Sequence, residues 1–274
     1  MENTIWRVML TPPAPGPWNM ALDEAILEGV GKKEVLPTLR LYAWQPACLS
    51  LGYAQSAKDV DQDQLRTCGW DLVRRPTGGR AILHTDELTY SVIAPLHEPR
   101  VYGSILESYR HLSTALLSAL SVLGLDAIAE KELAGSEKKK PAGPVCFEVP
   151  SSYEITVDGK KLIGSAQARR REGVLQHGSL PLTGDLTRIV QVLVFTSESQ
   201  RQIAAERLLE RALTIEACLG REVTWTEAAQ AFIQGFEAAL QIRLVTSAPT
   251  PIELARTQQL VATKYSHPDW TYRV

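Results

Sequence analysis

An Asp-Gly pair between two strand-like segments is the feature that most constrains the fold. Residues 153–157 alternate apolar and polar side chains, Asp158-Gly159 follows, and residues 161–167 form a second strand-like segment. Asp and Gly tolerate the positive φ angles that a two-residue hairpin turn requires. The sequence therefore predicts an antiparallel pair of strands in the middle of the chain.

The turn also fixes which residues of the two strands face each other. With two turn residues, Thr156 lies opposite Lys161 and Ile155 lies opposite Leu162. Lys161 then shares a face of its strand with uncharged neighbours, which is unusual for a lysine. It is either a guard against aggregation on an edge strand or a functional group, and the residues alone leave both open.

Strand-like segments dominate the first two thirds of the chain, and helical patterns dominate the rest from about residue 184. Asn19 has the position of a helix cap, and residues 102–125 carry a long helical pattern. Because successive strands have no helices between them, we expect an α+β (mixed α/β) fold with a mixed, largely antiparallel sheet flanked by helices. No linker divides the 274 residues, so we expect one domain over 1–274 with a helical C-terminal region.

Composition excludes several classes of protein. Lys and Arg number 29 and Asp and Glu 31, so the net charge of −2 argues against a generally basic nucleic-acid binder. No apolar run reaches the length of a membrane span, and the N-terminus has no signal-peptide pattern. Four cysteines without a CxxC pair argue against a zinc site and a disulfide framework. These features favour a cytoplasmic protein that binds neither nucleic acid nor membrane nor metal.

The segment Arg74-Arg75-Pro76-Thr77-Gly78-Gly79-Arg80 is the first candidate for a binding site. Two consecutive glycines let a backbone approach a ligand closely and expose its N–H groups. Three arginines supply positive charge for a phosphate or carboxylate. The alternative is a double-glycine hairpin turn with solvated arginines.

Cys146 is the candidate nucleophile, because it follows the loop-like residues 134–144 and precedes the predicted hairpin. A lysine ammonium within about 4 Å would favour its thiolate by up to ~4 kcal/mol at an effective dielectric constant near 20. The alternative is a buried, inert thiol. The other three cysteines lie in apolar or helical patterns and are interpreted as inert; they are Cys48, Cys68 and Cys218.

Two histidines are candidates for positioning rather than for catalysis. His84 follows the glycine segment and is close in sequence to Asp86 and Glu87, but further metal ligands are missing. His177 lies on a predicted strand and is interpreted as a hydrogen-bonding partner. The sequence also lacks the GxxxxGK[ST], GxGxxG, HExxH and GxSxG patterns of common nucleotide-binding proteins, zinc proteases and serine hydrolases.

These motifs, in this order, resemble the lipoate-protein ligase A superfamily. RRPTGGRAILH (74–84) is similar to its RRxSGGGAVxHD signature, and DGKKLIGSAQ (158–167) is similar to its DGrKIxGSAq hairpin. The segments 18–25 and 270–273 match as well. The similarity is greatest to the LipM-type octanoyltransferase branch, on RRPTGGRAILH, on PVCFEVP (144–150) and on VLQHGS (174–179).

The resemblance implies a fold of the biotin/lipoate ligase catalytic-domain type. It also implies transfer of an octanoyl group from octanoyl–acyl carrier protein, through a thioester on Cys146, to a lysine of a lipoyl domain or of the glycine-cleavage H protein. Lys161 would assist Cys146, and no cofactor would be needed. The remaining implied site residues bind substrate; they are Arg74, Arg75, Thr77, Gly78, Gly79, Arg80, His84, Gly164, Ser165, Ala166 and His177.

Three alternatives stay open at this point. Related enzymes are ATP-dependent lipoate ligases, but these carry a third glycine where Arg80 stands and an Asp directly after the histidine, whereas Asp86 stands one residue further on. Other relatives are amidotransferases that move octanoyl or lipoyl groups between lipoyl domains by similar cysteine chemistry. A non-catalytic acyl-binding protein that kept the fold is the third alternative.

Overall fold

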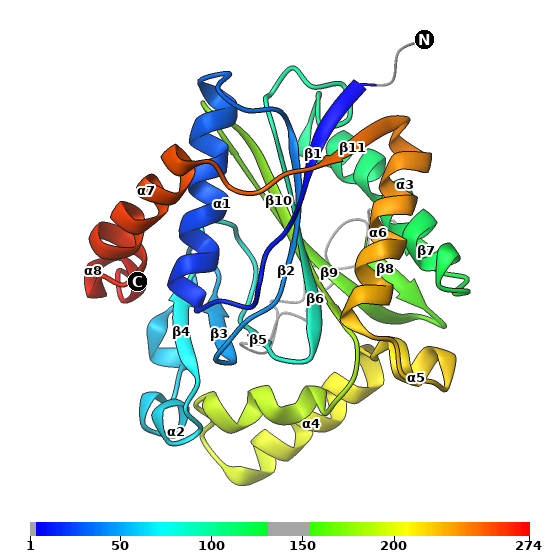
Figure 1. Cartoon of the computed structure of the whole chain (residues 1–274). Helices are drawn as coiled ribbons and strands as arrows, with labels where there is room; N and C mark the ends of the chain where they lie inside the picture. The colour runs from blue at the N-terminus through cyan, green and yellow to red at the C-terminus, as the bar shows by residue number, and fades with distance from the viewer. Residues whose placement is uncertain (1–3, 131–153) are drawn as a thin grey trace.

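The computed structural model describes residues 4–130 and 154–274 and contains two sheets (Figure 1). The large sheet has the strand order β11-β1-β2-β6-β10-β9-β8-β7, and the small sheet has the order β4-β3-β5. Among the strands of these described residues, the pairs β1–β11, β1–β2 and β3–β4 are parallel and the others antiparallel. The strands are β1 (Thr4–Leu10), β2 (Thr38–Tyr42), β3 (Cys48–Leu51), β4 (Asp71–Arg74), β5 (Ile82–His84), β6 (Glu87–Ala94), β7 (Ile128–Glu130), β8 (Glu154–Val157), β9 (Lys160–Arg170), β10 (Gly173–Pro181) and β11 (Ile242–Thr246). The predicted mixed, largely antiparallel fold class is confirmed.

Helices cover both faces of the large sheet, which gives the molecule three layers (Figure 1). On one side α3 and α6 pack on each other and on the sheet, and α1 lies on the opposite face with α7 outside it. Within the described residues no helix is both long and apolar enough to cross a membrane. The helices are α1 (Gly16–Gly31), η1 (Ala57–Asp59), α2 (Gln62–Thr67), α3 (Ile105–Val122), η3 (Leu186–Val192), α4 (Glu198–Arg211), α5 (Ile215–Leu219), α6 (Trp225–Leu240), α7 (Pro251–Leu260), the π-helical turn η4 (Val261–Tyr265) and α8 (Pro268–Thr271).

The alternation of β6 shows how the large sheet divides core from site. Leu88, Tyr90 and Val92 belong to the apolar core beneath α3 and α6. Thr89 and Ser91 lie between them in sequence and therefore point to the opposite face, where both are buried and hydrogen-bonded. One strand thus supplies the main core on one face and polar groups on the other.

Asn19 does not cap a helix, so that prediction is wrong. The helix α1 begins three residues earlier, at Gly16, after Pro15. The buried Asn19 amide instead donates to the carbonyl oxygens of Ala14 and Ala43, each at 3.0 Å, and its Oδ1 accepts from Arg40 at 2.6 Å. Asn19 ties α1 to the chain segments beside it.

The predicted hairpin is confirmed, with one correction to its register. Asp158 and Gly159 have φ angles of 50° and 74°, as a two-residue turn requires, and Thr156 faces Lys161. Ile155 faces Ile163 rather than Leu162, because a β-bulge between Ile155 and Thr156 shifts the pairing.

The position of β9 decides between the two interpretations of Lys161. The strand lies between β8 and β10, so it is not at the edge of the sheet. The Lys161 side chain is 4% exposed. An aggregation guard needs an exposed edge, so that interpretation is wrong.

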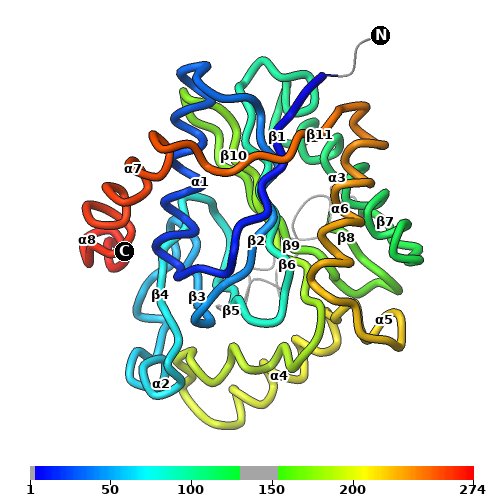
Figure 2. The backbone as a smooth tube through the Cα atoms, viewed as in Figure 1, coloured from blue at the N-terminus to red at the C-terminus, as the bar shows by residue number. Residues whose placement is uncertain are grey.

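Two strands that the sequence patterns do not predict lie side by side at one edge of the sheet. β1 is central to a parallel trio with β2 and β11, and β11 interrupts the helical C-terminal region. From β11 the chain runs across to α1, against which α7 and η4 pack, and α8 then packs on η4 and β4 (Figure 2). The C-terminal end thereby returns to β4 and to the loops beside it.

Candidate active site

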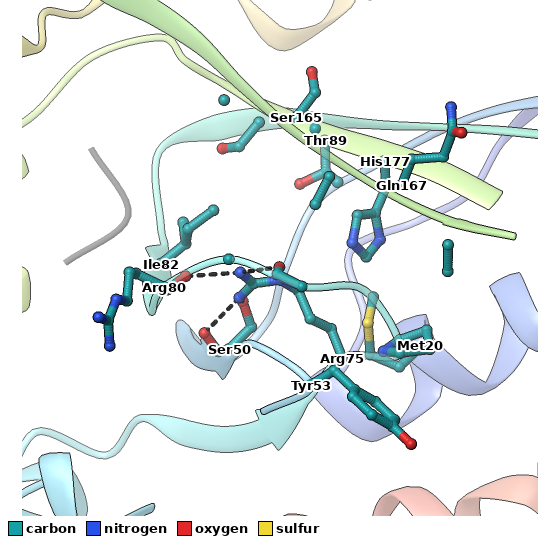
Figure 3. A pocket seen from close by; sticks show the side chains of 18 of the residues that line it. Met20, Ser50, Tyr53, Arg75, Arg80, Ile82, Thr89, Ser165, Gln167 and His177 are labelled. Atoms are coloured by element: carbon teal, nitrogen blue, oxygen red, sulfur yellow. Dashed lines mark hydrogen bonds between the residues drawn. The ribbon is translucent and has the colours of Figure 1, made fainter. Parts of the chain in front are cut away.

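A cavity of about 870 Å³ opens between the small sheet, the strands β9 and β10, and the C-terminal segment (Figure 3). Its volume falls within the range of small-molecule sites, about 300–1,000 Å³. Cys146 lies outside the described residues, and Arg74 and Thr77 do not line the cavity. The other predicted site residues line it; they are Arg75, Gly78, Gly79, Arg80, His84, Lys161, Gly164, Ser165, Ala166 and His177.

The segment Pro76–Arg80, called the glycine loop below, is not a hairpin turn. Its flanking strands β4 and β5 both pair with β3, which lies between them, so the loop crosses over the end of β3. A Cβ at Gly52, just after β3, would lie 1.9 Å from the carbonyl oxygen of Gly79. Only a glycine at position 52 allows the loop to pass this closely.

Arg75 fixes the shape of the glycine loop from inside. Its Nη2 donates to the carbonyl oxygens of Gly78 and Arg80 at 2.8 and 2.7 Å. Its Nη1 donates to the carbonyl oxygen and Oγ of Ser50 at 2.9 and 3.1 Å (Figure 3). Arg75 is buried, so the interpretation of this segment as a turn with solvated arginines is wrong for it.

Arg74 points away from the cavity and holds the C-terminal segment in place. Its buried guanidinium donates to the carbonyl oxygens of Gly52 and Gln55, each at 2.7 Å, and to that of Thr271 at 2.7 Å. The indole of Trp270 donates in return to the Arg74 carbonyl oxygen at 2.8 Å. These bonds join segments almost 200 residues apart.

His177 holds the glycine loop from the side of β10. Its Nε2 lies 2.6 Å from Oγ1 of Thr77, and its Nδ1 lies 3.9 Å from Oδ2 of Asp23. Burial lowers the pKa of His177, and Asp23 opposes that shift only in part. Burial would raise the pKa of Asp23, but Arg40 and His177 more than offset it, so that pKa is lowered. A neutral imidazole therefore lies between a buried carboxylate and the loop.

His84 belongs to a second buried chain of polar groups at the cavity wall. Its Nδ1 lies 2.8 Å from Oε1 of Glu87, and its Nε2 lies 2.8 Å from Oγ of Ser50. The Trp44 ring stacks on the imidazole at a centroid distance of 4.0 Å. Asp86, the other acidic residue of this segment, instead pairs with Arg188 and is half exposed.

Lys161 also lines the cavity and forms a buried ion pair. Its Nζ lies 2.5 Å from Oε1 of Glu154 on the neighbouring strand β8. The backbone of Leu213 donates to the Lys161 carbonyl oxygen at 3.2 Å, which ties β9 to the segment after α4. Strand, sheet neighbour and helix connection together fix the position of the ammonium group.

The C-terminal segment supplies cavity residues that the site predictions did not include. Lys264 and Trp270 line the cavity together with Tyr53. Lys264 Nζ lies 4.2 Å from the Trp270 ring centroid, and the Arg273 guanidinium lies 3.9 Å from that of Tyr53. The resemblance of residues 270–273 to the family marks this segment as part of the fold. No pattern in the segment itself indicates that it lies beside the glycine loop.

The three cysteines in the described part of the chain lie away from the cavity, and two of them have raised pKa values. Burial raises the pKa of Cys48 well above its ordinary value and that of Cys218 to about 11. None of Cys48, Cys68 and Cys218 lines the cavity. The same described residues contain no cluster of three or more His, Cys, Asp or Glu side chains that could hold a metal ion.

Comparisons with known proteins agree with this geometry. Residues 15–237 match the model of the lipoyl protein ligase A/B catalytic domain. The octanoyltransferase LipM of Brevibacillus brevis is 40% identical over 98% of this chain and 99% of its own, and that of Kyrpidia tusciae is 42% identical over 98% of each.

Two solved structures share the whole fold. A bipartite lipoate protein ligase of Thermoplasma acidophilum, solved in a study with its E2 lipoyl domain, has a TM-score of 0.81 and 26% identity over 98% of this chain and 96% of its own. A lipoate-protein ligase A bound with ATP has a TM-score of 0.78 and 28% identity over 99% of each. On sequence, fold and site, the chain belongs to the lipoyl protein ligase A/B catalytic-domain family.

Proposed function

We propose that this chain is a cytoplasmic octanoyltransferase of lipoate biosynthesis that works through a thioester on Cys146. Octanoyl–acyl carrier protein is the donor, and a lysine of a lipoyl domain or of the glycine-cleavage H protein is the acceptor. Relatives named as octanoyltransferases over nearly the full length support the reaction class. The observation that carries the proposal is Lys161, a buried cation in the wall of a large cavity on an interior strand.

Both steps are acyl transfers that need no external energy source. In the first step the Cys146 sulfur attacks the carbonyl carbon of the donor thioester, and the carrier thiol leaves with a proton. In the second step the acceptor lysine amine attacks the Cys146 thioester, an amide forms, and the Cys146 thiol is restored by the proton that the amine loses. A thioester is already activated, so neither step consumes ATP.

Lys161 supplies positive charge where negative charge develops. Both steps pass through a tetrahedral intermediate with a negatively charged oxygen, which a fixed ammonium group stabilises. The ion pair with Glu154 holds that group in place before substrate arrives, so no reorganisation is needed during the reaction. The same charge favours the thiolate of Cys146.

Intact-mass spectrometry after mixing with octanoyl–acyl carrier protein, without ATP, tests the proposal. We expect one added octanoyl group, mapped to Cys146 and removed by a lipoyl domain. Cys146→Ala should abolish both the adduct and transfer. Cys218→Ala is the matched control and should keep both, because that thiol lies outside the cavity and its pKa is raised to about 11.

Other outcomes would favour the related activities. Pyrophosphate release on addition of lipoate and ATP, without an adduct from the carrier protein, would indicate a lipoate ligase. An adduct formed only from an octanoylated lipoyl protein would indicate an amidotransferase. Binding of octanoate without any transfer would indicate an acyl-binding protein, and each of these results contradicts the proposed donor.

A further inference from the structure

Ser50, His84 and Glu87 form a continuous hydrogen-bonded chain that the proposed chemistry does not use. All three side chains are buried, and they come from β3, β5 and the start of β6. The Ser50 Oγ to His84 Nε2 and His84 Nδ1 to Glu87 Oε1 distances are both 2.8 Å. In the pairing of β3 with β5, His84 lies opposite Cys48 and Ser50 lies opposite Ile82, so the serine and the histidine are diagonal neighbours on one face of the small sheet.

Counting donors and acceptors gives the chain a direction. Burial would raise the pKa of Glu87, but His84, Ser179 and Thr89 more than offset it, and the pKa is lowered. Glu87 is thus a carboxylate that only accepts hydrogen bonds, so Nδ1 of His84 carries a proton toward it. In the tautomer that carries its proton on Nδ1 alone, Nε2 accepts the proton of the Ser50 hydroxyl. A lone pair of Ser50 Oγ then faces a donor.

The donor that meets Ser50 Oγ is the guanidinium of Arg75. Nη1 of Arg75 lies 3.1 Å from that oxygen and 2.9 Å from the carbonyl oxygen of the same residue. Nη2 of Arg75 holds the carbonyl oxygens of Gly78 and Arg80. The hydrogen-bonded chain therefore runs from Glu87 through His84, Ser50 and Arg75 to the glycine loop (Figure 3 shows its last part).

The environment of the chain keeps its members in one arrangement. Trp44 covers the imidazole of His84, and its indole nitrogen donates at 2.7 Å to Thr89, whose hydroxyl in turn bonds to Glu87. Ser179 on β10 also donates to Glu87. A carboxylate with three donors does not leave its histidine, so the tautomer of His84 is fixed.

A serine, histidine and carboxylate at these distances also have the geometry of a hydrolase triad, so the role of Ser50 must be decided. A nucleophilic serine needs a lone pair aimed at the substrate carbonyl carbon. Ser50 lies in the cavity wall, but it has no exposed surface, and Arg75 donates to its Oγ. This geometry favours positioning of Arg75 over attack on a substrate.

We propose that Ser50, His84 and Glu87 form a positioning triad that orients Arg75 and, through it, the Gly78–Gly79 peptide at the acyl site. In a trans peptide the carbonyl and the N–H point in opposite directions. The hydrogen bond from Arg75 to the Gly78 carbonyl oxygen therefore directs the Gly79 N–H away from the guanidinium. The triad thus fixes the orientation of the glycine loop. That this orientation serves acyl transfer rests on the proposed function.

A double-mutant cycle between Ser50 and Arg75 tests this role. We expect Ser50→Ala to lower the kcat of transfer by about tenfold with little change in KM, since a small misplacement of site groups slows the reaction step. We expect Arg75→Lys to lower it further, and the double variant to be no slower than Arg75→Lys, because Ser50 acts through Arg75. Multiplied effects in the double variant would contradict the proposal.

Controls separate positioning from a general loss of packing. Ser50→Thr keeps the hydroxyl and should recover most of the rate. Ser113→Ala is the matched control, because that buried hydroxyl on α3 lies outside the cavity and donates to the Arg110 carbonyl oxygen of its own helix at 2.8 Å. It should keep the wild-type rate. Labelling of Ser50 by a fluorophosphonate ester, a reagent for activated serines, would overturn the positioning role.

A spectroscopic measurement keeps the test independent of turnover. In protein with nitrogen-labelled histidine, we expect a proton on Nδ1 of His84, which faces Glu87, and we expect Glu87→Gln to change that spectrum. If the wild-type protein transfers no octanoyl group, the proposed function fails while this spectrum still reports on the triad. A His84 proton on Nε2 alone would overturn the triad whatever the activity.

Discussion

Arg74 and Arg75 are neighbours in sequence, but they stabilise two different regions of the molecule. Arg74 belongs to the C-terminal clamp, defined as Arg74, residues 52–55, Trp270 and Thr271. Arg75 belongs to the pocket floor, defined as Ser50, Arg75, residues 78–80, His84 and Glu87. Both guanidinium groups are buried and donate mainly to carbonyl oxygens.

The two regions differ in the sequence distance that their hydrogen bonds span. Arg74 donates to acceptors 19 to 197 residues away in sequence. Arg75 donates to loop carbonyls three and five residues away and to Ser50, which is 25 residues away. Bonds between distant segments hold the fold together, and bonds within a loop set its shape. We therefore expect damage to the clamp to lower stability and damage to the floor to lower the rate of transfer.

The largest expected effect is on stability, from Arg74→Lys. A lysine cannot reproduce a planar fork that donates to several carbonyl oxygens, and buried acceptors are left unsatisfied. We expect the free energy of unfolding to fall by about 3 kcal/mol in urea denaturation. Arg75→Lys is the comparison and should cost about half as much stability but more of the kcat. Equal stability losses with equal kcat losses would remove the distinction between the regions.

Gly52→Ala tests the point where the two regions touch. Gly52 accepts from Arg74 of the clamp, and its Cα lies against the Gly79 carbonyl of the floor. A methyl group there would lie 1.9 Å from that oxygen, so the loop must move, at a cost of about 2 kcal/mol. We expect loss of both stability and kcat, measured by thermal unfolding and octanoyl transfer.

Gly78→Ala is the matched control for the stability part of that prediction. A Cβ at Gly78 meets no atom within 4 Å. The melting temperature should therefore stay near that of the wild type, whatever happens to substrate binding. A Gly52→Ala protein as stable as Gly78→Ala would show that the loop does not need its close crossing over β3.

The sequence predicts those parts of the site that depend on local chemistry. The Asp-Gly turn places Lys161 correctly because a two-residue turn determines the pairing next to it. The bulge beyond Thr156 is not encoded by the turn, so the predicted partner of Ile155 is wrong. Likewise, the double glycine marks a close backbone approach, but only the strand order β4-β3-β5 shows that the loop crosses β3.

Residues brought in from distant segments could not be predicted in this way. Ser50 lies in the apolar-looking segment Cys48–Leu51, and nothing in that segment reports that it will lie between Arg75 and His84. Strands β1 and β11 were missed because their pairing joins the two ends of the chain. The predicted roles of Arg74 and Thr77 in substrate binding stay predictions, although both side chains bond to the protein itself.

Trp270→Phe sharpens the description of the clamp. Phenylalanine keeps an aromatic ring but loses the indole N–H that donates to the Arg74 carbonyl oxygen at 2.8 Å. We expect a loss of about 1 kcal/mol, the net value of one hydrogen bond, in urea denaturation. Because Trp270 also lines the cavity, the KM for the octanoyl donor should rise more than the kcat falls. An unchanged stability would limit the clamp to Arg74 alone.

The smallest expected effect is a dependence of the free energy of unfolding on pH. It concerns the contact between β1 and α7, which belongs neither to the clamp nor to the floor. The guanidinium of Arg7 on β1 donates to the Glu253 carboxylate of α7 at 2.7 Å. Burial would raise the pKa of Glu253, but Arg7 and the N–H of Thr250 more than offset it, and the pKa lies below 4.5. A carboxyl with a lower pKa in the folded state stabilises the fold above its unfolded pKa, near 4.5, and this contribution is lost as the pH falls through the folded value.

Glu253→Gln removes the titrating group while keeping a hydrogen-bond acceptor for Arg7, so its effect at neutral pH should be modest. Below pH 4.5 the wild-type protein should lose stability faster than the variant, because only the wild type must protonate this carboxyl. Urea denaturation at a series of pH values measures the two slopes. Parallel slopes would mean that the ion pair between β1 and α7 contributes nothing that depends on pH. Acid sensitivity would then come from other carboxyls with lowered pKa values, such as Asp23 and Glu87.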